Sequence, residues 1–227
     1  MKKKTFYTEL SYALGLIIMA FAASFTEKAD FGMSMVVAPA YILHLKVSQY
    51  LPWFTFGVAE YAFQGVLILL IVIIMRKFKL SYLFSFVTAV LYGTLLDCAM
   101  KIVSFLPEDT VVLRIVWYLL GTVLCSFAVS LFFHTYIAPE AYELIVKEFS
   151  QKFNCNINKL KTAYDCASVA LGIIMSFCFF GFGVFKGVGI GTVLCAACNG
   201  FLIGRFSKLL EKHFEFKNRF NLEKYFN

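Results

Sequence analysis

Acidic and amide side chains interrupt the long apolar runs of this sequence at a few positions. Glu60 and Gln64 fall one helical turn apart in one run, and Asp165 falls near the start of another. A charge within a membrane helix costs about 2.5–3.5 kcal/mol on insertion scales, so such residues usually face other protein and mark routes for ions or solutes. These carboxylates are candidates for binding a cation or a proton, although Glu60 could instead reach the outer headgroups.

Two acids have a basic residue with which they could pair. Asp97 stands four residues before Lys101, a spacing typical of an ion pair on one helix face. Asp165 could form a structural salt bridge with Arg205 of the last apolar run, or it could couple transport to a proton or cation. Asp97 and Asp165 therefore join Glu60 as candidate substrate-binding residues.

Tyr92 and Asn199 fall near the middle of two apolar runs, and each precedes a glycine. Gly93 and Gly200 would let two helices approach closely, with the polar side chains bonding across the contact. The same geometry would suit a central substrate site made of Tyr92, Asn199 and Gln64. Both a helix crossing and a ligand site fit this pattern.

Three glycines, Gly187, Gly189 and Gly191, stand just before the last apolar run, with Lys186 beside them. Free backbone amides at the start of a helix can bind an anion. The Gly-Lys-Ser/Thr end of a phosphate-binding loop is absent. The pattern favours a tight outer turn with close helix packing, so these glycines, like Arg205, are predicted to be structural or gating residues.

Common enzyme signatures are missing from the sequence. Neither H-E-x-x-H nor G-x-S-x-G occurs. Cys195 and Cys198 form a C-x-x-C that could serve redox or metal chemistry, but no second pair or nearby His completes a metal site. The cysteines fit better as small buried apolar residues. We therefore expect neither an enzyme nor a bound cofactor or metal.

The composition is that of a membrane protein. Of the 227 residues, 60% are hydrophobic and 15% are charged, and the mean hydropathy is +0.76. Soluble domains carry about 25% charged residues, and a soluble chain this apolar would expose large greasy patches. The net charge of +7 lies in short clusters between apolar runs. No nucleic-acid partner is expected.

Six apolar runs are long enough to cross a bilayer as helices, which takes about 20 residues each. If the spans alternate, sixteen of the 21 Lys and Arg fall on one side, which places both termini in the cytoplasm. The first run is not expected to be a cleaved leader, because its pattern returns in mid-chain. The predicted spans are residues 10–25, 54–75, 81–103, 112–136, 162–182 and 189–209.

Two connecting segments are predicted to hold short helices. Residues 31–53 are apolar but interrupted by Pro39 and Pro52, which predicts a short helix lying on or dipping into the outer face. Residues 140–153 alternate acids and bases with apolar residues at helical spacing, which predicts an amphipathic helix on the inner surface. Residues 211–227 are predicted to form a basic cytoplasmic tail.

Short motifs recur in the same order in the two halves of the chain. Because each half holds three spans, an odd number, the second half must enter the membrane from the opposite side. We therefore predict an all-α polytopic fold, one transmembrane domain over residues 1–227, made of two inverted three-helix repeats at about 8–104 and 112–210. The matched motifs are Leu14-Gly15 and Leu120-Gly121, Phe21-Ala22 and Phe127-Ala128, Ala38-Pro39 and Ala138-Pro139, Glu60-Tyr61 and Tyr164-Asp165, and Tyr92-Gly93 and Asn199-Gly200.

Several of these motifs resemble the YitT/YczE-like bacterial membrane proteins. They are Ala138-Pro139-Glu140-Ala141, the following amphipathic segment, Asp165, the glycine-rich residues 187–192, and Phe31-Gly32-Met33-Ser34. Asn199-Gly200 stands where that family has a Gly-Pro step, and the soluble C-terminal domain of YitT-type members is missing, so the chain is closer to the YczE branch. The resemblance implies a bacterial cell membrane protein and mainly supports the fold, because the family's molecular function is poorly defined.

The inverted repeat and the intramembrane acids favour a transporter of a small polar or cationic solute that works by alternating access. One alternative is a non-transporting membrane protein that binds a ligand or regulates a partner. Another is the substrate-binding subunit of a larger transporter. The expected partners are the lipid bilayer and a small molecule or ion, and the sequence indicates no oligomeric state.

Overall fold

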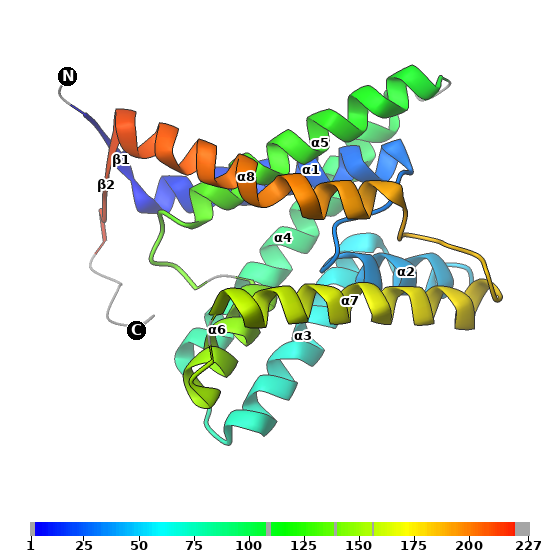
Figure 1. Cartoon of the computed structure of the whole chain (residues 1–227), viewed down its shortest axis with the longest axis horizontal. Helices are drawn as coiled ribbons and strands as arrows, with labels where there is room; N and C mark the ends of the chain where they lie inside the picture. The colour runs from blue at the N-terminus through cyan, green and yellow to red at the C-terminus, as the bar shows by residue number, and fades with distance from the viewer. Residues whose placement is uncertain (1–2, 108–109, 139, 156, 221–227) are drawn as a thin grey trace.

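Eight helices and two short strands make up the described part of the chain, which is residues 3–107, 110–138, 140–155 and 157–220 of a computed structural model (Figure 1). The helices are α1 (Thr8–Ala29), α2 (Ala38–Val47), α3 (Phe56–Met75), α4 (Leu80–Ser104), α5 (Val111–Phe132), α6 (Ala141–Phe153), α7 (Ile157–Phe180) and α8 (Ile190–His213). The strands are β1 (Lys4–Tyr7) and β2 (Phe214–Lys217).

Six of the described helices, α1, α3, α4, α5, α7 and α8, are long and apolar enough to cross a membrane. This confirms the predicted all-α polytopic membrane fold, with spans close to the predicted ranges. The main core forms where α1, α2 and α4 meet, around Leu16, Ile42 and Tyr92. Small residues such as Ala20 and Ala99 let these helices pack closely there.

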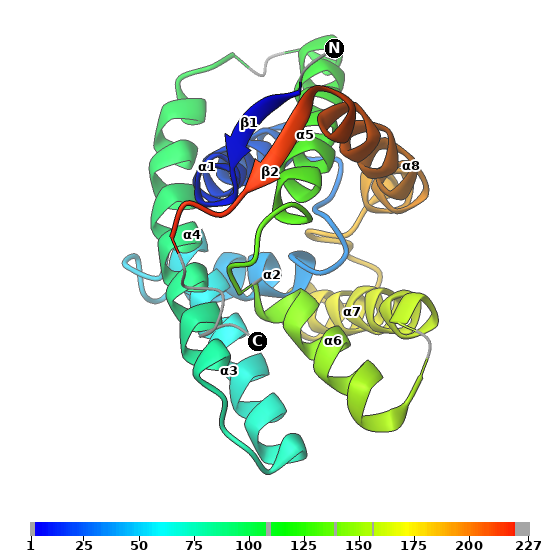
Figure 2. The same cartoon turned by 90° about the vertical axis from the view of Figure 1, so that its left-hand side faces the viewer.

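The helices follow one order twice, namely long, short, long, long, first in α1–α4 and then in α5–α8. α1 and α5 lie side by side and run in opposite directions (Figures 1 and 2). Ser11, early in α1, donates to the carbonyl of Leu131 at the end of α5, and Arg114, early in α5, pairs with Asp30 just after α1. Equivalent helices are therefore antiparallel, as an inverted repeat requires.

Contacts between α1 and α5 occur as a matched pair. The space beside Gly15 of α1 is filled by the ring of Phe132, and the space beside Gly121 of α5 is filled by Thr26. Gly15 and Gly121 are separated by the same interval as Thr26 and Phe132. A two-fold rotation that exchanges the two halves would therefore place the Gly15–Phe132 contact on the Thr26–Gly121 contact. The two glycines matched in the sequence thus lie at a pseudo-two-fold interface between the halves.

The contacts of the other helices are related by the same exchange of the two halves. α4 lies along α1, where the hydroxyls of Tyr12 and Thr88 are 2.7 Å apart, and α8 lies along α5, where Tyr118 donates to the Gly191 carbonyl. The short helices take partners from both halves, because α2 packs on α3 and α7, and α6 packs on α7 and α3. Both short helices therefore cross the boundary between the halves.

The two halves differ at their last pair of helices. α3 and α4 cross so closely that a Cβ on Gly57 would lie 2.0 Å from the carbonyl oxygen of Gly93. α7 and α8 do not cross in this way in the described residues, and they stand apart in both views (Figures 1 and 2). Only 17% and 11% of their apolar windows are buried, against 33% and 39% for α3 and α4. The α3–α4 pair of the first half is therefore closed, and the equivalent α7–α8 pair of the second half is open.

The two chain ends meet in a parallel strand pair, β1 with β2, in which Lys4 lies opposite Phe214. The carboxylate of Glu9 accepts hydrogen bonds from the backbone amides of Arg219 and Phe220 beside these strands. Both ends of the described chain thus lie at one end of the bundle, called the terminal side below, and the opposite end is the far side. Within the predicted tail, residues 211–213 are the end of α8 and residues 214–217 form β2, whereas residues 221–227 lie outside the described residues.

α6 is not the surface helix that the sequence predicted. Its first turn bonds to the side chains of Glu60 and Gln64 on α3, and Lys152 in its last turn bonds to the Ile74 carbonyl near the end of α3. α6 therefore starts inside the bundle and runs beside α3 to the terminal side. Its apolar face, which includes Leu144 and Ile145, packs in a protein cluster with α3. The amphipathic pattern correctly predicted a helix, but the prediction that its apolar face contacts lipid was wrong.

Irregular backbone leads into both short helices. Residues 30–37 enter from the far side, and Met33 bonds to the carbonyl of Gly187 and to the side chain of Thr192. Residues 133–140 enter from the terminal side, where the carbonyl of Ala138 accepts from Thr88; Pro139 lies outside the described residues. Non-helical backbone at membrane depth is tolerated where protein buries it or where it lines a water-filled cavity. α2 confirms that residues 31–53 hold a short helix.

Candidate functional site

A buried hydrogen-bond cluster joins α3 to α6. Glu60 and Gln64 are fully buried and Tyr142 is 1% exposed. The Tyr142 hydroxyl donates to the Glu60 carboxylate over 2.8 Å, and the backbone amide of Ala141 donates to the Gln64 amide oxygen over 3.1 Å. Glu60 and Gln64 share one face, as predicted. The alternative that Glu60 reaches the headgroups is wrong, because its carboxylate is directed at α6.

Glu140, just before α6, brings a second carboxylate to this cluster. The amide nitrogen of Gln64 lies 3.4 Å from one carboxylate oxygen of Glu60 and 3.5 Å from one of Glu140, so the two acids share a single weak donor. The other carboxylate oxygen of each acid is buried without a hydrogen-bond partner among the described residues. Burial, together with the nearby charges of Glu143 and Glu60, raises the pKa of Glu140 well above its ordinary value.

Positive charge near this carboxylate pair, Glu60 and Glu140, is already engaged. Lys161 of α7 favours the charged form of Glu140, but its ammonium lies 3.1 Å from Asp165 and 4.0 Å from Glu143. Two carboxylate oxygens that share one nitrogen at these distances are at most about 7 Å apart, so two ionised acids would repel by at least about 2 kcal/mol at an effective dielectric constant of about 20. The pair is therefore suited to hold a proton or a cation between its members.

A further acid on α6, Glu148, is buried and has a hydrogen-bond donor for each of its carboxylate oxygens. Glu148 is 3% exposed and lies one turn beyond Leu144 on the protein-facing side of α6. One of its oxygens accepts from Lys79 over 2.6 Å, and the other accepts from Tyr82 over 2.8 Å. Its charge is compensated, which marks it as a structural tie between α6 and α4.

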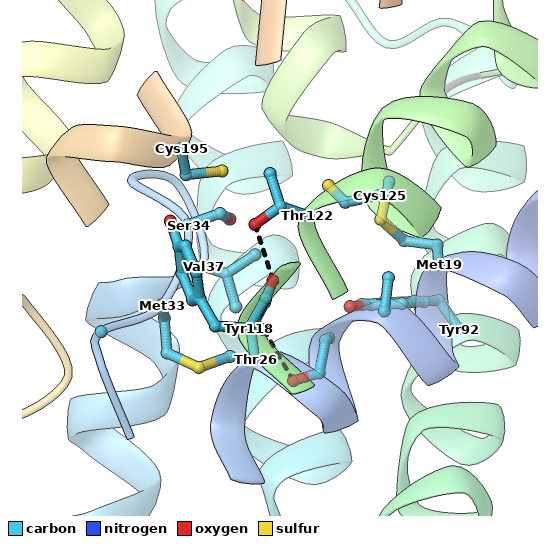
Figure 3. Close-up of a pocket in the computed structure, with 13 residues that line it drawn as sticks. Met19, Thr26, Met33, Ser34, Val37, Tyr92, Tyr118, Thr122, Cys125 and Cys195 are labelled. Atoms are coloured by element: carbon cyan, nitrogen blue, oxygen red, sulfur yellow. Dashed lines mark hydrogen bonds between the residues drawn. The ribbon is translucent and has the colours of Figure 1, made fainter. Parts of the chain in front are cut away.

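A small cavity of about 30 Å³ is lined in part by Tyr92 (Figure 3). It has room for about one or two water molecules. Its walls come from α1, α4, α5, α8 and residues 30–37, and the Tyr92 hydroxyl is directed into it. Tyr92 is 2% exposed and lies near enough to Glu60 and Glu140 for their charges to act on it. Tyr92 therefore borders the cavity and also lies within electrostatic range of the carboxylate pair.

A wider polar basin of about 420 Å³ opens at the far side. It is lined by Glu27, Lys28, Asp30, Tyr41 and Arg114, which come from α1, α2 and α5. Tyr41 donates to Glu27 over 3.3 Å, and Arg114 pairs with Asp30 over 3.1 Å. The basin thus offers both signs of charge where the two halves meet at the far side.

The family described as "Family of unknown function (DUF6198)" matches residues 6–208. The chain belongs to this DUF6198 family. The match begins in β1 and extends through most of α8. It therefore includes both carboxylates of the pair and both segments of irregular backbone.

One curated relative of this DUF6198 protein is also described without a function. The "Uncharacterized protein YyaS" of Bacillus subtilis (strain 168) is 25% identical over 213 residues, which cover 92% of this chain and 96% of the relative. No solved structure matches the chain. The comparisons therefore give the family without a function, and the multi-pass membrane character rests on the six long apolar helices.

Asp97 does not join the carboxylate pair of the DUF6198 protein. Its oxygens accept from the Thr55 hydroxyl over 2.6 Å and from the Gly57 amide over 2.8 Å, so it caps the start of α3. The predicted ion pair with Lys101 is also absent from the described residues. The first amides of α3 offered Asp97 better partners than an exposed lysine did.

Asp165 is not the counterpart of Glu60, although the sequence match suggested that it was. Its carboxylate lies 3.1 Å from Lys161 one turn earlier on α7, and its side chain is partly exposed. The predicted salt bridge with Arg205 is wrong, because α7 and α8 stand apart. Arg205 instead lies over the ring of Phe201 on its own helix, 5.1 Å from the ring centre.

Tyr92 and Asn199, the matched polar residues of the third spans, have different surroundings. Asn199 accepts from Ser126 over 2.6 Å and so ties α8 to α5, which is the predicted bond across a helix contact. It lies away from Gln64, so a single site of Tyr92, Asn199 and Gln64 does not form. Gly93 lies at a close helix crossing as predicted, whereas a Cβ on Gly200 would meet nothing within 4 Å.

The glycine-rich segment before α8 forms a tight turn against residues 30–37. A Cβ on Gly189 or Gly191 would lie 2.4 or 2.7 Å from the Phe31 carbonyl oxygen, and Gly187 has a φ of +71° that favours glycine. The Gly191 amide donates to Phe31 and the Gly189 amide donates to Thr192. These amides are used in packing, so the predicted structural role fits and the anion-site alternative does not.

The C-x-x-C motif brings no second thiol to the cavity. Cys195 is buried and lines the cavity, whereas Cys198 is exposed. Within the part of the chain that the structure describes, no group of three His, Cys, Asp or Glu side chains could hold a metal ion.

No functional role was predicted for Glu140 or Tyr142, which prove to be central to the cluster. Both stood in the segment predicted to lie on the inner surface, where charged and amphipathic residues need no special explanation. One signal was present. Glu140 alone interrupts the match between Ala38-Pro39-Ala40-Tyr41 and Ala138-Pro139-Glu140-Ala141-Tyr142, so an acid is inserted in only one half.

Proposed function

We propose that this protein transports a small cationic or polar solute by alternating access, with the carboxylate pair Glu60 and Glu140 as the central part of its site. The observation that carries the proposal is a pair of acids, each with one buried and unpartnered carboxylate oxygen, at the contact between the two halves. Intramembrane acids are costly and usually serve ions or solutes. The pair is formed by α3 of the first half and the entry to α6 of the second.

The arrangement of the halves supports this proposal. Equivalent helices run antiparallel, and the Gly15 and Gly121 contacts exchange under a pseudo-two-fold rotation. Inverted repeats suit alternating access, because exchanging the conformations of the halves opens the opposite side. The closed α3–α4 crossing and the separated α7 and α8 are two such unlike conformations.

Irregular backbone near the centre is a second support. Many secondary transporters bind substrate where broken helices from two repeats meet near the midplane. Residues 30–37 line the cavity beside Tyr92, and residues 133–140 carry Glu140. The two segments enter from opposite sides, so each half contributes one segment to the proposed route.

The charges at the site favour a cationic or an uncharged polar solute. The pair brings two carboxylates, while Lys161 is held by Asp165 and Glu143. An anion would face uncompensated negative charge, so a cation or an uncharged polar solute is favoured. The absence of enzyme signatures and the fixed glycine amides agree with binding and transport rather than catalysis.

Location follows as part of the same proposal. The terminal side collects most of the Lys and Arg outside the spans, so the positive-inside rule assigns it to the cytoplasm of a bacterial cell. The motif similarity to YitT/YczE-like bacterial membrane proteins agrees with the plasma membrane of a bacterium. The far-side basin would then open outward.

Uptake by purified protein tests the proposal directly. Proteoliposomes are incubated with a mixture of small cationic and polar metabolites, and the contents retained after washing are measured by mass spectrometry. We expect wild-type protein to accumulate at least one cationic or polar compound. Glu60→Gln should abolish that uptake, whereas Asp165→Asn should retain it, because Asp165 is partly exposed and lies outside the pair.

The same preparation separates transport from binding. A compound that raises the melting temperature of the protein and is not taken up would favour a non-transporting binding protein. Co-purification with an ATPase together with a lack of independent uptake would favour a subunit of a larger transporter. Equal uptake by wild type and Glu60→Gln would exclude the proposed site.

A further inference from the structure

Donors and acceptors do not balance around the carboxylate pair. Glu60 and Glu140 offer four carboxylate oxygens, and the described donors to them are the Tyr142 hydroxyl and the amide nitrogen of Gln64. One buried oxygen on each acid is left without a donor. Glu148, in contrast, has a donor for each oxygen. The fold can therefore supply donors to both oxygens of a buried acid, and among the described residues it does not do so at the pair.

The groups that face the pair do not supply the missing positive charge. The tyrosines around it come from four helices, and their electrostatic interactions with one or both acids involve Tyr12, Tyr92, Tyr142 and Tyr164. Glu143 adds negative charge. Lys161 lies within 4.0 Å of both Asp165 and Glu143, and these neighbours offset its charge. Two ionised acids would thus have only the Tyr142 hydroxyl and the Gln64 amide as described donors, beside a lysine that is already engaged.

We infer that Glu60 and Glu140 together bind one exchangeable proton, which a small monovalent cation of the alkali or ammonium type displaces. With one proton, one acid is neutral and can donate to an oxygen that lacks a donor. When the cation enters, the proton leaves to water and both acids are ionised. The pair and its occupant carry a net charge of −1 in both states.

This stoichiometry has a consequence for transport. If the proposed transport function holds, one cation moves in exchange for one proton and the cycle carries no net charge. The role in transport rests on the proposed function. The competition between proton and cation does not, because it can be measured on purified protein in detergent.

Carboxyl labelling measures this competition. Dicyclohexylcarbodiimide is an apolar reagent that reacts with protonated carboxyl groups in apolar surroundings, and mass spectrometry locates and counts the adducts. At neutral pH we expect one adduct per chain, divided between Glu60 and Glu140, and none on Glu148. Raising the pH should lower the labelling several-fold. Sodium, potassium or methylammonium chloride should do the same at neutral pH, relative to N-methylglucamine chloride at equal ionic strength.

Variants identify the source of the proton. The double variant Glu60→Gln/Glu140→Gln should take no adduct, and Glu148→Gln should label like wild type; melting temperatures show which variants are folded. The labelling of wild-type protein across pH and in the different salts does not depend on any variant being folded. Labelling that is absent at neutral pH, or that none of the three cations reduces, would overturn the inference while leaving the uptake assay to decide the proposed function. If the pair is labelled and cations reduce the labelling, but no uptake is seen, the inference stands and the proposed transport function is excluded.

Discussion

The hydroxyl of Tyr142 lies 2.8 Å from the carboxylate of Glu60, across 82 positions of sequence and across the boundary between the two halves. Its matched tyrosine in the first half, Tyr41, donates instead to Glu27 of the same half over a longer 3.3 Å. The two tyrosines occupy equivalent short helices, yet only one reaches a buried acid. The fold therefore repeats its backbone while placing its acidic site in one half alone.

Replacing this phenol tests how strongly it holds α6 to α3. Tyr142→Phe removes the donor and leaves a buried carboxylate with less support, which should cost about 1–3 kcal/mol of stability. We expect a lower melting temperature in detergent. Tyr41→Phe is the matched control and should cost less, because its bond to Glu27 is longer and lies at the open far-side basin. Equal losses in the two variants would contradict a special role for the Tyr142 bond.

The helix crossing at Gly57 gives a second prediction. A methyl group there would lie 2.0 Å from the Gly93 carbonyl oxygen, so Gly57→Ala should push α3 and α4 apart and cost about 1–3 kcal/mol or more. Gly200→Ala adds the same methyl group in a helix interior where nothing lies within 4 Å, and it should be neutral or stabilising by up to about 1 kcal/mol. Thermal unfolding of both variants makes the comparison. A stable Gly57→Ala protein would show that the crossing can relax.

The sequence predicted the six spans and the repeat because both depend on local patterns. Apolar runs of membrane length identify helices directly. The glycines at 15 and 121 were matched by spacing alone, and they prove to face Phe132 and Thr26 in the reciprocal α1–α5 contact. Small residues at helix contacts are part of the pattern that membrane packing requires, so the sequence could indicate them.

Long-range choices were not visible in the sequence. Asp97 had a plausible partner four residues away, and it took the hydroxyl and amide of Thr55 and Gly57 on another helix. The amphipathic pattern of α6 fits a lipid surface and a protein groove equally well, so Glu140 was assigned to the surface. β1 and β2 are four residues each and pair across nearly the whole chain, which no local pattern could show.

Glu140 gives the protein a predictable dependence on pH. Its pKa is raised in the folded state, chiefly by burial, so between the ordinary pKa of about 4.3 and that raised value the folded chain binds more protons than the unfolded chain. Stability should therefore fall as the pH rises through this interval. Melting curves across the interval should show a shallower fall in Glu140→Gln than in wild type. An equally steep fall in the variant would assign the dependence to other groups.

The junction of the chain ends depends on Glu9. Its carboxylate accepts from the amides of Arg219 and Phe220 and from the Tyr136 hydroxyl. Glu9→Ala removes these acceptors, so hydrogen exchange should become faster at residues 214–220 and in the neighbouring end of α8. Glu211→Ala is a suitable control, because Glu211 is exposed at the same end and contacts His134 and Ser207 only over 3.4 Å. Unchanged exchange in Glu9→Ala would show that the strand pair holds without it.

Alternating access predicts that the open and closed helix pairs exchange their states. Spin labels at Leu171 of α7 and Phe201 of α8, both exposed, report the separated pair. Labels at Val66 and Thr94, their counterparts on α3 and α4 in the repeat, report the closed pair, in a background whose native cysteines are replaced. Shifting the pH across the titration of the carboxylate pair should shorten the first distance while it lengthens the second. The double variant Glu60→Gln/Glu140→Gln should hold both distances fixed. If the two distances change in the same direction, or not at all, the halves do not exchange conformations and the difference between them is a permanent feature of the fold.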